Sequence, residues 1–309
     1  MKIYFAPVQG YTEAAYRNAH YSVFGGVDAY YTPFVRMEKG GFRNKDLRDI
    51  APENNKPDHI VPQLIANDKT EAQAIVNRFI SLDYKEIDIN MGCPFPRIVN
   101  QGKGSGILRD TAAVKGLMDI VKMYPDILFS IKIRLGWEDG KEAFNLLPIL
   151  NDAPLLHITL HPRLGKQAYK GLCDMDAFSE FIIRCKHPII YNGDITTMEK
   201  AREIMDDFPE LKGIMIGRGL LANPALALEI KNKEAMAHNV FIEKTGELHN
   251  KIATYYKDTL QGEAQLMSKL KTIWDYLLPD ADKKLRKKIM KATRFDAYSI
   301  AVNELLRSY

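Results

Sequence analysis

The chain is poor in the features that mark secreted or metal-stabilised proteins. Its 309 residues include only three cysteines, Cys93, Cys173 and Cys185, and no two of them lie close together in the sequence. The spacing excludes a disulfide framework and a zinc ribbon. Each cysteine is therefore expected to be a reduced thiol, and no metal site is expected.

Long apolar runs are also missing. No stretch approaches the roughly 18 apolar residues of a membrane span, and the apolar run within Met1–Pro7 is too short for a signal peptide. The composition, 46% hydrophobic and 27% charged, is close to that of ordinary globular proteins. We therefore expect a cytoplasmic, monomeric protein without a membrane partner.

The net charge of +4 is unevenly distributed. Residues 1–235 contain 30 Lys and Arg against 30 Asp and Glu, whereas the last 74 residues contain 13 against 9. Much of the C-terminal positive charge lies in a basic cluster, which we define as Lys283, Lys284, Arg286, Lys287 and Lys288. Such a run is often only a solvated helix face, but it is also a candidate site for a polyanion.

Short apolar segments rich in β-formers recur through the first 220 residues. The eight segments are Ile3–Val8, Ala29–Val35, Ile60–Ile65, Glu86–Met91, Phe129–Leu135, Leu155–His161, Pro188–Ile195 and Gly213–Gly219. Most are separated by segments with helical spacing: Thr70–Leu82, Thr111–Met123, Ala143–Leu150, Asp176–Cys185 and Thr197–Phe208. This alternation predicts an α/β protein with a (β/α)8 TIM barrel.

The alternative architecture is an open doubly wound sheet. It is disfavoured because no Gly-x-Gly-x-x-Gly follows the first strand. From about Asn239 the strand pattern ends and helical segments follow, over Ile242–Leu260, Glu263–Leu277 and Asp282–Thr293. We predict a barrel domain over residues 1–238 and a small C-terminal α-helical domain over 239–309, which contains the basic cluster.

Active sites of TIM barrels lie at the carboxyl ends of the strands. Glycines Gly193 and Gly217 follow the last two predicted strands, where this fold usually binds phosphate, and Arg218 accompanies them. A lone glycine more often just makes a turn. Glycines in both loops beside an arginine favour a phosphate site, because backbone N–H groups can approach the anion.

Lys132 and His161 end adjacent predicted strands and should point into the mouth of the barrel. Together they could hold an electron-rich ring such as a reduced flavin. The other interpretations are a solvated lysine and a core histidine. Burying an unpaired lysine within the apolar run Phe129–Ile133 would be costly, which favours a functional role.

Cys93 stands in a sharply turned loop, between Gly92 and Pro94, after the fourth predicted strand. Buried cysteines are usually inert, and we assign Cys173 and Cys185 to that class. The strand-end position makes Cys93 the candidate reactive thiol.

Several motifs together resemble one family. They are Ala6-Pro7, Asn90-Met91-Gly92-Cys93-Pro94, Gly102-Lys103-Gly104-Ser105-Gly106, Lys132-Ile133-Arg134-Leu135-Gly136, His161-Pro162-Arg163, Asn192-Gly193-Asp194-Ile195 and Met215-Ile216-Gly217-Arg218-Gly219. In order and spacing they resemble the tRNA-dihydrouridine synthases, nearly end to end across the barrel. The Asn-x-Gly-Cys-Pro element is the most discriminating.

The resemblance implies FMN at the barrel mouth, NADPH as reductant and a tRNA uridine as substrate. By position, Pro7 and Gln63 would contact the flavin ring, and Lys132 and His161 its edge and ribityl side. Asn192, Gly193, Asp194, Gly217 and Arg218 would hold its phosphate. Asn90, Arg134, Arg163 and Tyr169 would face the uracil, and the C-terminal helices with the basic cluster would bind tRNA.

The chemistry of the implied reaction gives Cys93 a role. Hydride addition at C6 of uracil leaves negative charge delocalised from C5 onto the 4-oxygen, so an acid is required near C5. A protonated thiol on a strand-end loop suits general acid catalysis. The segment Thr32–Arg36 and the C-terminal helices differ between subfamilies, so the modified tRNA position is not predicted.

Three other functions fit parts of the sequence. A flavin barrel acting on a free pyrimidine or an enone would leave the basic cluster unexplained. An aldolase barrel would use Lys132 to form a Schiff base and would be colourless. A non-catalytic RNA-binding barrel would bind RNA without flavin.

Overall fold

The computed structural model describes all 309 residues and contains a parallel β-barrel. Its strands are β1 (Lys2–Phe5), β2 (Ala29–Tyr31), β5 (Ile60–Val61), β6 (Gln63–Leu64), β7 (Glu86–Met91), β8 (Leu128–Gly136), β9 (Leu155–Leu164), β10 (Ile189–Tyr191) and β11 (Gly213–Ile216). Their order is β5-β2-β1-β11-β10-β9-β8-β7-β6. β5 and β6 are halves of one segment interrupted at Pro62, which has no N–H to donate. Counted together they give eight strands, and the predicted barrel is confirmed.

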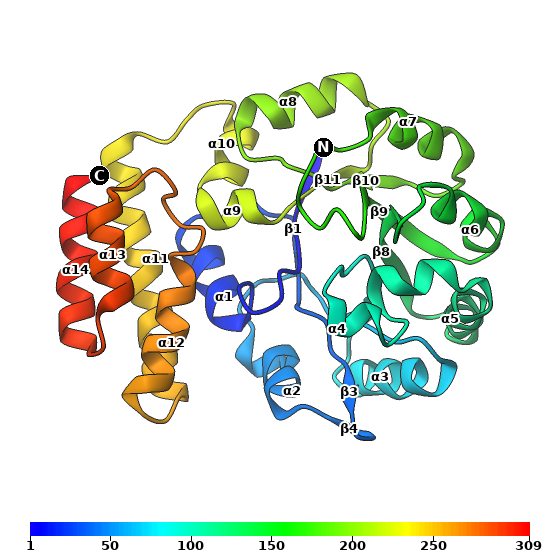
Figure 1. The fold of residues 1–309 in the computed structure, drawn as a ribbon, viewed down its shortest axis with the longest axis horizontal. Coiled ribbons are helices and arrows are strands. Elements are labelled where there is room, and N and C mark those ends of the chain that lie inside the picture. Colours follow the sequence, from blue (N-terminus) through cyan, green and yellow to red (C-terminus); the bar gives the residue numbers. More distant parts are fainter.

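Helices surround the barrel, as the view in Figure 1 shows. They are α1 (Ala14–Val23), α3 (Lys69–Ser81), α5 (Thr111–Met123), α6 (Lys141–Asn151), α7 (Met175–Arg184), α8 (Met198–Asp207) and α10 (Leu226–Asn232). Side-chain caps start several of them: Asp68, Asp110, Asp174 and Thr197 each accept a backbone N–H from the first turn. The apolar stripes of these helices pack on the strands, so the predicted strand–helix alternation is observed.

Short elements follow several strands at the carboxyl end of the barrel. They are the hairpin β3 (Met37–Glu38) and β4 (Gly41–Phe42), α2 (Asn44–Ile50), η1 (Pro52–Asn54), α4 (Pro96–Val99), η2 (Gly104–Arg109) and α9 (Arg218–Ala222). Four predicted strands were too long at this end, and the first of them, predicted to reach Val8, stops at Phe5 in β1. β2 stops at Tyr31, β10 at Tyr191 and β11 at Ile216, because the segments that follow, which contain Pro33, Gly193 and Gly217, turn at the barrel mouth instead of continuing the ladder.

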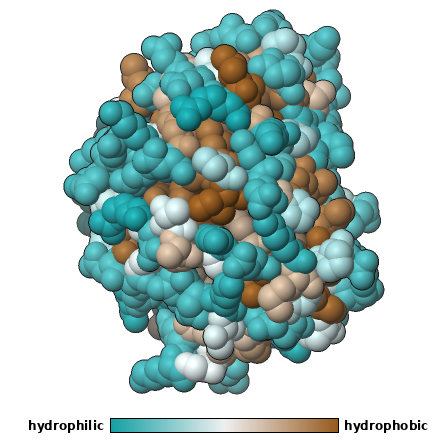
Figure 2. Space-filling view, turned by 90° about the vertical axis from the view of Figure 1, so that its right-hand side faces the viewer, coloured by the Kyte–Doolittle hydropathy of each residue, from teal (hydrophilic) through white to brown (hydrophobic).

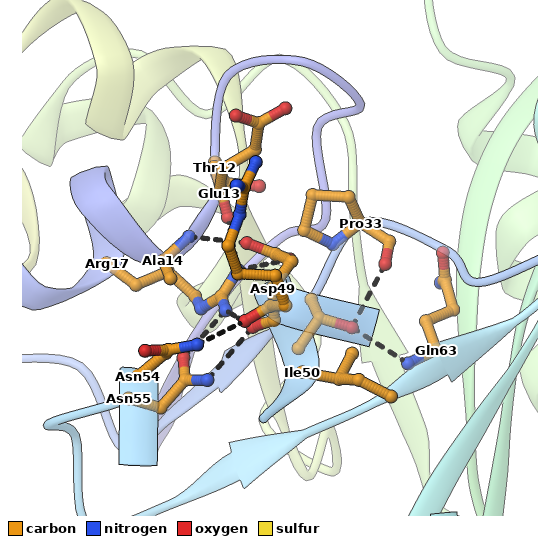
Figure 3. Close-up of polar contacts among 12 residues, drawn as sticks. Thr12, Glu13, Ala14, Arg17, Pro33, Asp49, Ile50, Asn54, Asn55 and Gln63 are labelled. Atoms are coloured by element: carbon orange, nitrogen blue, oxygen red, sulfur yellow. Dashed lines mark hydrogen bonds and ion pairs between the residues drawn. The ribbon is translucent and has the colours of Figure 1, made fainter. Parts of the chain in front are cut away.

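The junction between α1 and α2 is held by one buried ion pair (Figure 3). Arg17, which is fully buried, donates to the carbonyl of Thr12 at 2.6 Å, to Asp49 Oδ2 at 3.1 Å and to Asn55 Oδ1 at 2.7 Å. Asp49 Oδ1 also accepts the N–H of Ala14 at 2.6 Å. Asp49 therefore replaces the side-chain cap that α1 lacks, and it fixes the long β2–β5 connection against the barrel.

Beyond α10 the chain is helical: α11 (His238–Thr259), α12 (Glu263–Ile273), α13 (Lys283–Lys291) and α14 (Phe295–Ser308). Figure 1 shows these helices side by side, next to α1 and α10. Inside them Tyr298 OH bonds His249 Nε2 at 2.8 Å and accepts the indole N–H of Trp274 at 2.9 Å. Buried apolar side chains form one cluster from Ile3 in β1 to Leu305 in α14, so the helices pack directly on the barrel.

The side of the barrel opposite α11–α14 is covered by α3, α5 and α6. Figure 2 shows that this face is mostly hydrophilic, with hydrophobic side chains exposed in smaller patches. Amphipathic helices on a barrel produce such a surface, because their apolar sides are used against the strands. None of the helices combines the length and the apolar character that crossing a bilayer requires.

Candidate active site at the carboxyl end of the barrel

A cavity of 640 Å³ opens at the carboxyl ends of the strands. Its size is within the range of ligand pockets, roughly 300–1,000 Å³. Twelve of the residues predicted from sequence line it: Pro7, Asn90, Cys93, Lys132, Arg134, His161, Tyr169, Asn192, Gly193, Asp194, Gly217 and Arg218. The structure therefore brings together residues from almost the whole length of the barrel.

Gln63 and Arg163 lie behind the cavity surface instead of lining it. Gln63 is 0% exposed and hydrogen-bonds to Asp88 and Asn90. Arg163 is 1% exposed and donates to His161 Nε2, to the carbonyl of Gly171 and to Asp194. Both support residues that do line the cavity, a placement that the sequence pattern does not distinguish from direct contact.

The loop that carries Cys93 is held on several sides. Asn90 Oδ1 accepts the N–H groups of Gly92 at 3.1 Å and of Cys93 at 2.9 Å. The carbonyl of Cys93 accepts both the N–H and the hydroxyl of Ser105, each at 3.0 Å. A Cβ at Gly104 would lie 2.6 Å from the same carbonyl oxygen, so η2 can pack this closely only with glycine there.

The thiol of Cys93 lies in a half-buried position within the cavity. Burial raises the pKa of Cys93 above its usual value, although a backbone hydrogen bond from Phe95 and the charges of Arg134 and Lys132 act in the opposite direction. The thiol is therefore protonated at neutral pH. This state suits a proton donor and is unfavourable for a nucleophile.

The side chain of Lys132 projects from β8 into the cavity, and its ammonium makes no hydrogen bond or ion pair within the chain. Burial lowers the pKa of Lys132 to about 8, and the positive charge of Arg134 contributes to the decrease. Asp88 acts in the opposite direction. A desolvated ammonium without a partner is costly, so the geometry favours a bound group that accepts its hydrogen bonds.

His161 is held as a neutral ring. Burial lowers its pKa well below the usual value, and Arg134 and Lys132 add to the effect. Its Nε2 lies 3.2 Å from Nη1 of Arg163, which can only donate. Nε2 is therefore the acceptor, and the ring proton is on Nδ1, which is left as a donor for a ligand.

Tyr169 lines the cavity and packs against two guanidinium groups. The Arg218 guanidinium carbon is 4.3 Å from the centre of the tyrosine ring, and that of Arg134 is 5.6 Å from it. The ring also stacks on His161 at 6.4 Å. Arg134 is further fixed by donating to the carbonyls of Gly92 and Leu164 at 3.0 and 2.9 Å. These contacts make a rigid, positively charged wall.

The loops after β10 and β11 form another wall. Asp194 has a positive φ of 43° and pairs with both Arg163 and Arg218. A Cβ at Gly193 would lie 2.7 Å from the sulfur of Cys173, so Cys173 packs beneath this loop. Asn192 donates to the carbonyl of Met215 at 2.7 Å, which ties the loop after β10 to β11.

Sequence reasoning missed several cavity residues. They are three cations from the β2–α2 segment, Arg36, Arg43 and Lys45, two aromatics, Phe34 and Phe95, and the pair Tyr11 and Tyr276. Tyr276 is the only cavity residue from beyond α10, and its ring meets that of Tyr11 edge-on at 4.9 Å. Tyr11 also donates to Asp275 at 2.9 Å. No local motif marks these residues, because the fold alone brings the segment after α12 to the barrel mouth.

The basic cluster lies on α13, and its five side chains differ in exposure and in hydrogen-bond partners. Lys283, Lys284 and Lys287 are exposed and form no ion pair, whereas Lys288 pairs with Glu304 at 2.8 Å. Arg286 turns inward and donates to the carbonyls of Trp274, Leu277 and Leu278. The structure contains no group of three or more His, Cys, Asp or Glu side chains that could hold a metal ion.

The family is identified by comparison with known proteins. A family model described as "Dihydrouridine synthase (Dus)" matches residues 4–308. The chain belongs to the dihydrouridine synthase family. A probable tRNA-dihydrouridine synthase of Helicobacter pylori is 28% identical over 233 residues, which cover 74% of this Dus chain and 70% of the relative. The tRNA-dihydrouridine synthase B of Pseudomonas putida is 28% identical over 228 residues, with coverages of 74% and 67%. The resemblance inferred from the motifs is confirmed.

Two solved structures show how widely the fold of this Dus chain is shared. A variant of NCR from Zymomonas mobilis superposes with a TM-score of 0.53 at 12% identity, covering 76% of this chain and 88% of the other. Morphinone reductase gives a TM-score of 0.50 at 12% identity, with coverages of 78% and 88%. At this identity the likeness concerns the barrel fold alone.

Proposed function

We propose that this Dus chain reduces a uridine of tRNA to 5,6-dihydrouridine, using FMN that NADPH reduces. Membership of the family supports the reaction, and the names of the relatives support tRNA as the substrate. The single observation that carries the mechanism is the thiol of Cys93, kept protonated by burial in the same cavity as Lys132.

The chain's own residues fit a flavin nucleotide. Lys132 offers an unpartnered ammonium, and His161 offers a free Nδ1–H, so the cavity presents two donors to an electron-rich ring. Gly193, Gly217 and Arg218 all line the cavity, where a phosphate would meet a guanidinium and the backbone N–H groups of glycines. Pro7 adds an apolar surface against which a planar ring can pack.

When bound, FMN supplies the hydride for C6 of the uracil. The remaining work belongs to the protein. Cys93 donates the proton to C5, and burial of the thiol prevents its loss to solvent before transfer. Arg134 uses Nε and Nη1 to hold the loops, which leaves Nη2 to donate to a uracil carbonyl. Asn90 retains one amide hydrogen for the same purpose.

The position of the cavity implies that the target base leaves its stack. A uracil within an RNA helix cannot reach a thiol inside the barrel mouth, so the base must be flipped into the cavity. Exposed lysines of the basic cluster would hold the RNA body through its phosphates. Arg36, Arg43 and Lys45 at the cavity rim add positive charge near the flipped nucleotide.

The decisive experiment compares Cys93→Ala with the parent protein and with Cys185→Ala, whose half-buried thiol lies outside the cavity. After reconstitution with FMN, all three proteins should show flavin absorption and reduction by NADPH. Dihydrouridine formation on tRNA should fall by roughly 10²- to 10⁴-fold in Cys93→Ala only, as expected for removal of a general acid.

Other outcomes point to other functions. Absence of flavin absorption after reconstitution would sink the proposal and favour an RNA-binding or aldolase barrel. Turnover of a free pyrimidine or an enone without turnover of tRNA would identify a reductase of small molecules. Unchanged dihydrouridine formation in Cys93→Ala would remove the acid role from this thiol.

A further inference from the structure

A buried carboxylate lies beneath the cavity, and the mechanism above does not use it. Asp88 is 0% exposed and does not line the cavity. It precedes Asn90 by two residues on β7, so both side chains lie on the same face of the strand. Asp88 accepts hydrogen bonds from Gln63 Nε2 at 2.6 Å and from Ser130 Oγ at 2.7 Å.

These bonds have a fixed direction. An ionised carboxylate can only accept, so Gln63 must turn its NH2 group toward Asp88. Gln63 Oε1 is then left to accept Asn90 Nδ2 at 2.8 Å. Asn90 must in turn present Oδ1 to the N–H groups of Gly92 and Cys93. The carboxylate thus determines the orientation of two amides and, through them, the anchoring of the Cys93 loop.

Reversal of either amide would break this anchoring. If Gln63 presented Oε1 to the residue at position 88, its NH2 group would face Asn90, and Asn90 would have to accept that bond with Oδ1. The NH2 group of Asn90 would then face the N–H groups of the loop, donor against donor. An arrangement that leaves buried donors unsatisfied is unfavourable, so the loop would move.

We propose that Asp88 is a positioning residue whose acceptor oxygens orient Gln63 and Asn90 and thereby place the Cys93 loop. The effect of Asp88 on proton transfer rests on the proposed function, whereas its effect on the position of the Cys93 loop does not. The charged and titratable neighbours of Asp88 are Lys132 on β8, Glu86 on its own strand and Tyr31 on β2. Burial raises the pKa of Asp88 to about 6, so the carboxylate remains ionised at neutral pH.

Three variants of the full chain test these hydrogen bonds, which run from Asp88 through Gln63 and Asn90 to the Cys93 loop. Asp88→Leu removes both acceptors at similar volume. Asp88→Asn retains an oxygen for Gln63, because its new amide group can donate to the hydroxyl of Ser130. Ser130→Ala removes the other partner of Asp88 and leaves Gln63 in place, which makes it the matched control.

The main readout is the rate at which iodoacetamide alkylates Cys93 across pH, followed by mass spectrometry of the peptide that contains it. In Asp88→Leu the loop should loosen, the thiol pKa should fall toward its usual value, and alkylation at pH 8 should accelerate at least about threefold. Asp88→Asn and Ser130→Ala should remain within about twofold of the parent protein. With flavin and tRNA, kcat should fall on the order of tenfold in Asp88→Leu, while KM for tRNA stays within about twofold.

Two results would overturn the proposal: a parent-like alkylation profile in Asp88→Leu, or equal damage in Asp88→Asn, which would assign the effect to charge alone. If Asp88→Leu does not fold, Gln63→Leu, which removes the amide between Asp88 and Asn90, replaces it. A parent-like alkylation profile in Gln63→Leu is equally contrary to the proposal. Lack of flavin or of dihydrouridine formation would count against the proposed function but would leave the alkylation result intact.

Discussion

Positive charge occurs in two regions of this molecule under opposite physical conditions. At the cavity, Arg134 in its lining and Arg163 behind it are 2% and 1% exposed, and Lys132 in the lining is half-buried. On α13, the lysines of the basic cluster are exposed to solvent. The cavity cations keep fixed positions and interact through a medium of low dielectric, whereas those of α13 are mobile and screened. The first arrangement suits recognition of one chemical group, and the second suits attraction of a large polyanion.

The contrast between cavity cations and exposed cations predicts that replacing Lys132 has the largest effect on ligand binding. Replacement by Met should weaken binding of FMN to the flavin-free protein by roughly 10- to 100-fold, which corresponds to a charge-assisted hydrogen bond of about 1.5–3 kcal/mol. Flavin fluorescence titration measures this directly. A matched change outside the cavity, Lys212→Met, should leave the affinity within about twofold, because Lys212 does not line the cavity. Equal losses in both variants would contradict the assignment.

The same lysine predicts a pH dependence. Because burial lowers the pKa of Lys132 to about 8, its charge is present below that pH and is lost as the pH rises through it. Flavin affinity of the flavin-free protein should therefore decline above about pH 8. In Lys132→Arg the decline should disappear from this range, because a guanidinium stays protonated. A decline at the same pH in Lys132→Arg would show that another group is responsible.

Features that depend on local sequence were predictable, whereas features that depend on contacts between distant segments were not. The barrel was predictable because strand and helix periodicities are local, and strand ends identified Lys132 and His161 because the fold gathers them there. The ends of β1, β2, β10 and β11 were overestimated by three or four residues, because the chain leaves the ladder to form the loops that line the cavity. Tyr276 could not be predicted, since only the packing of the C-terminal helices against the barrel brings it to the site.

The basic cluster shows more clearly what the sequence alone cannot predict. In the sequence Arg286 is equivalent to its lysine neighbours, but in the structure it donates to three backbone carbonyls just beyond the end of α12. Helical geometry alone turns one of the five side chains inward while its neighbours point to solvent. Charge patterning therefore located a helix with exposed lysines but could not tell which of its basic side chains face solvent.

Arg286 provides the next prediction in size. Arg286→Ala removes the donor to the carbonyls of Trp274 and Leu277, whereas that of Leu278 keeps the N–H of Ala281, and it should lower the free energy of unfolding by about 1–3 kcal/mol. Thermal or urea denaturation followed by circular dichroism measures the change. Lys284→Ala, which alters an exposed side chain of the same helix, should change stability by no more than about 0.5 kcal/mol. Loss of tRNA affinity in Arg286→Ala at unchanged stability would instead place this arginine on the RNA-binding surface.

The smallest and most condition-dependent effect is expected from the exposed lysines. Reversing Lys284 and Lys287 to Glu should weaken tRNA binding severalfold at low salt, and it should reduce the slope of log affinity against log salt by roughly one for each phosphate that is no longer neutralised. Lys288→Glu should place two carboxylates side by side, because Lys288 already pairs with Glu304. Its effect on affinity would therefore be accompanied by a loss of stability, which the other two reversals lack. Equal affinity and an equal salt slope in Lys284→Glu/Lys287→Glu would mean that α13 is only a solvated face, and that the cations at the rim of the cavity bind the RNA.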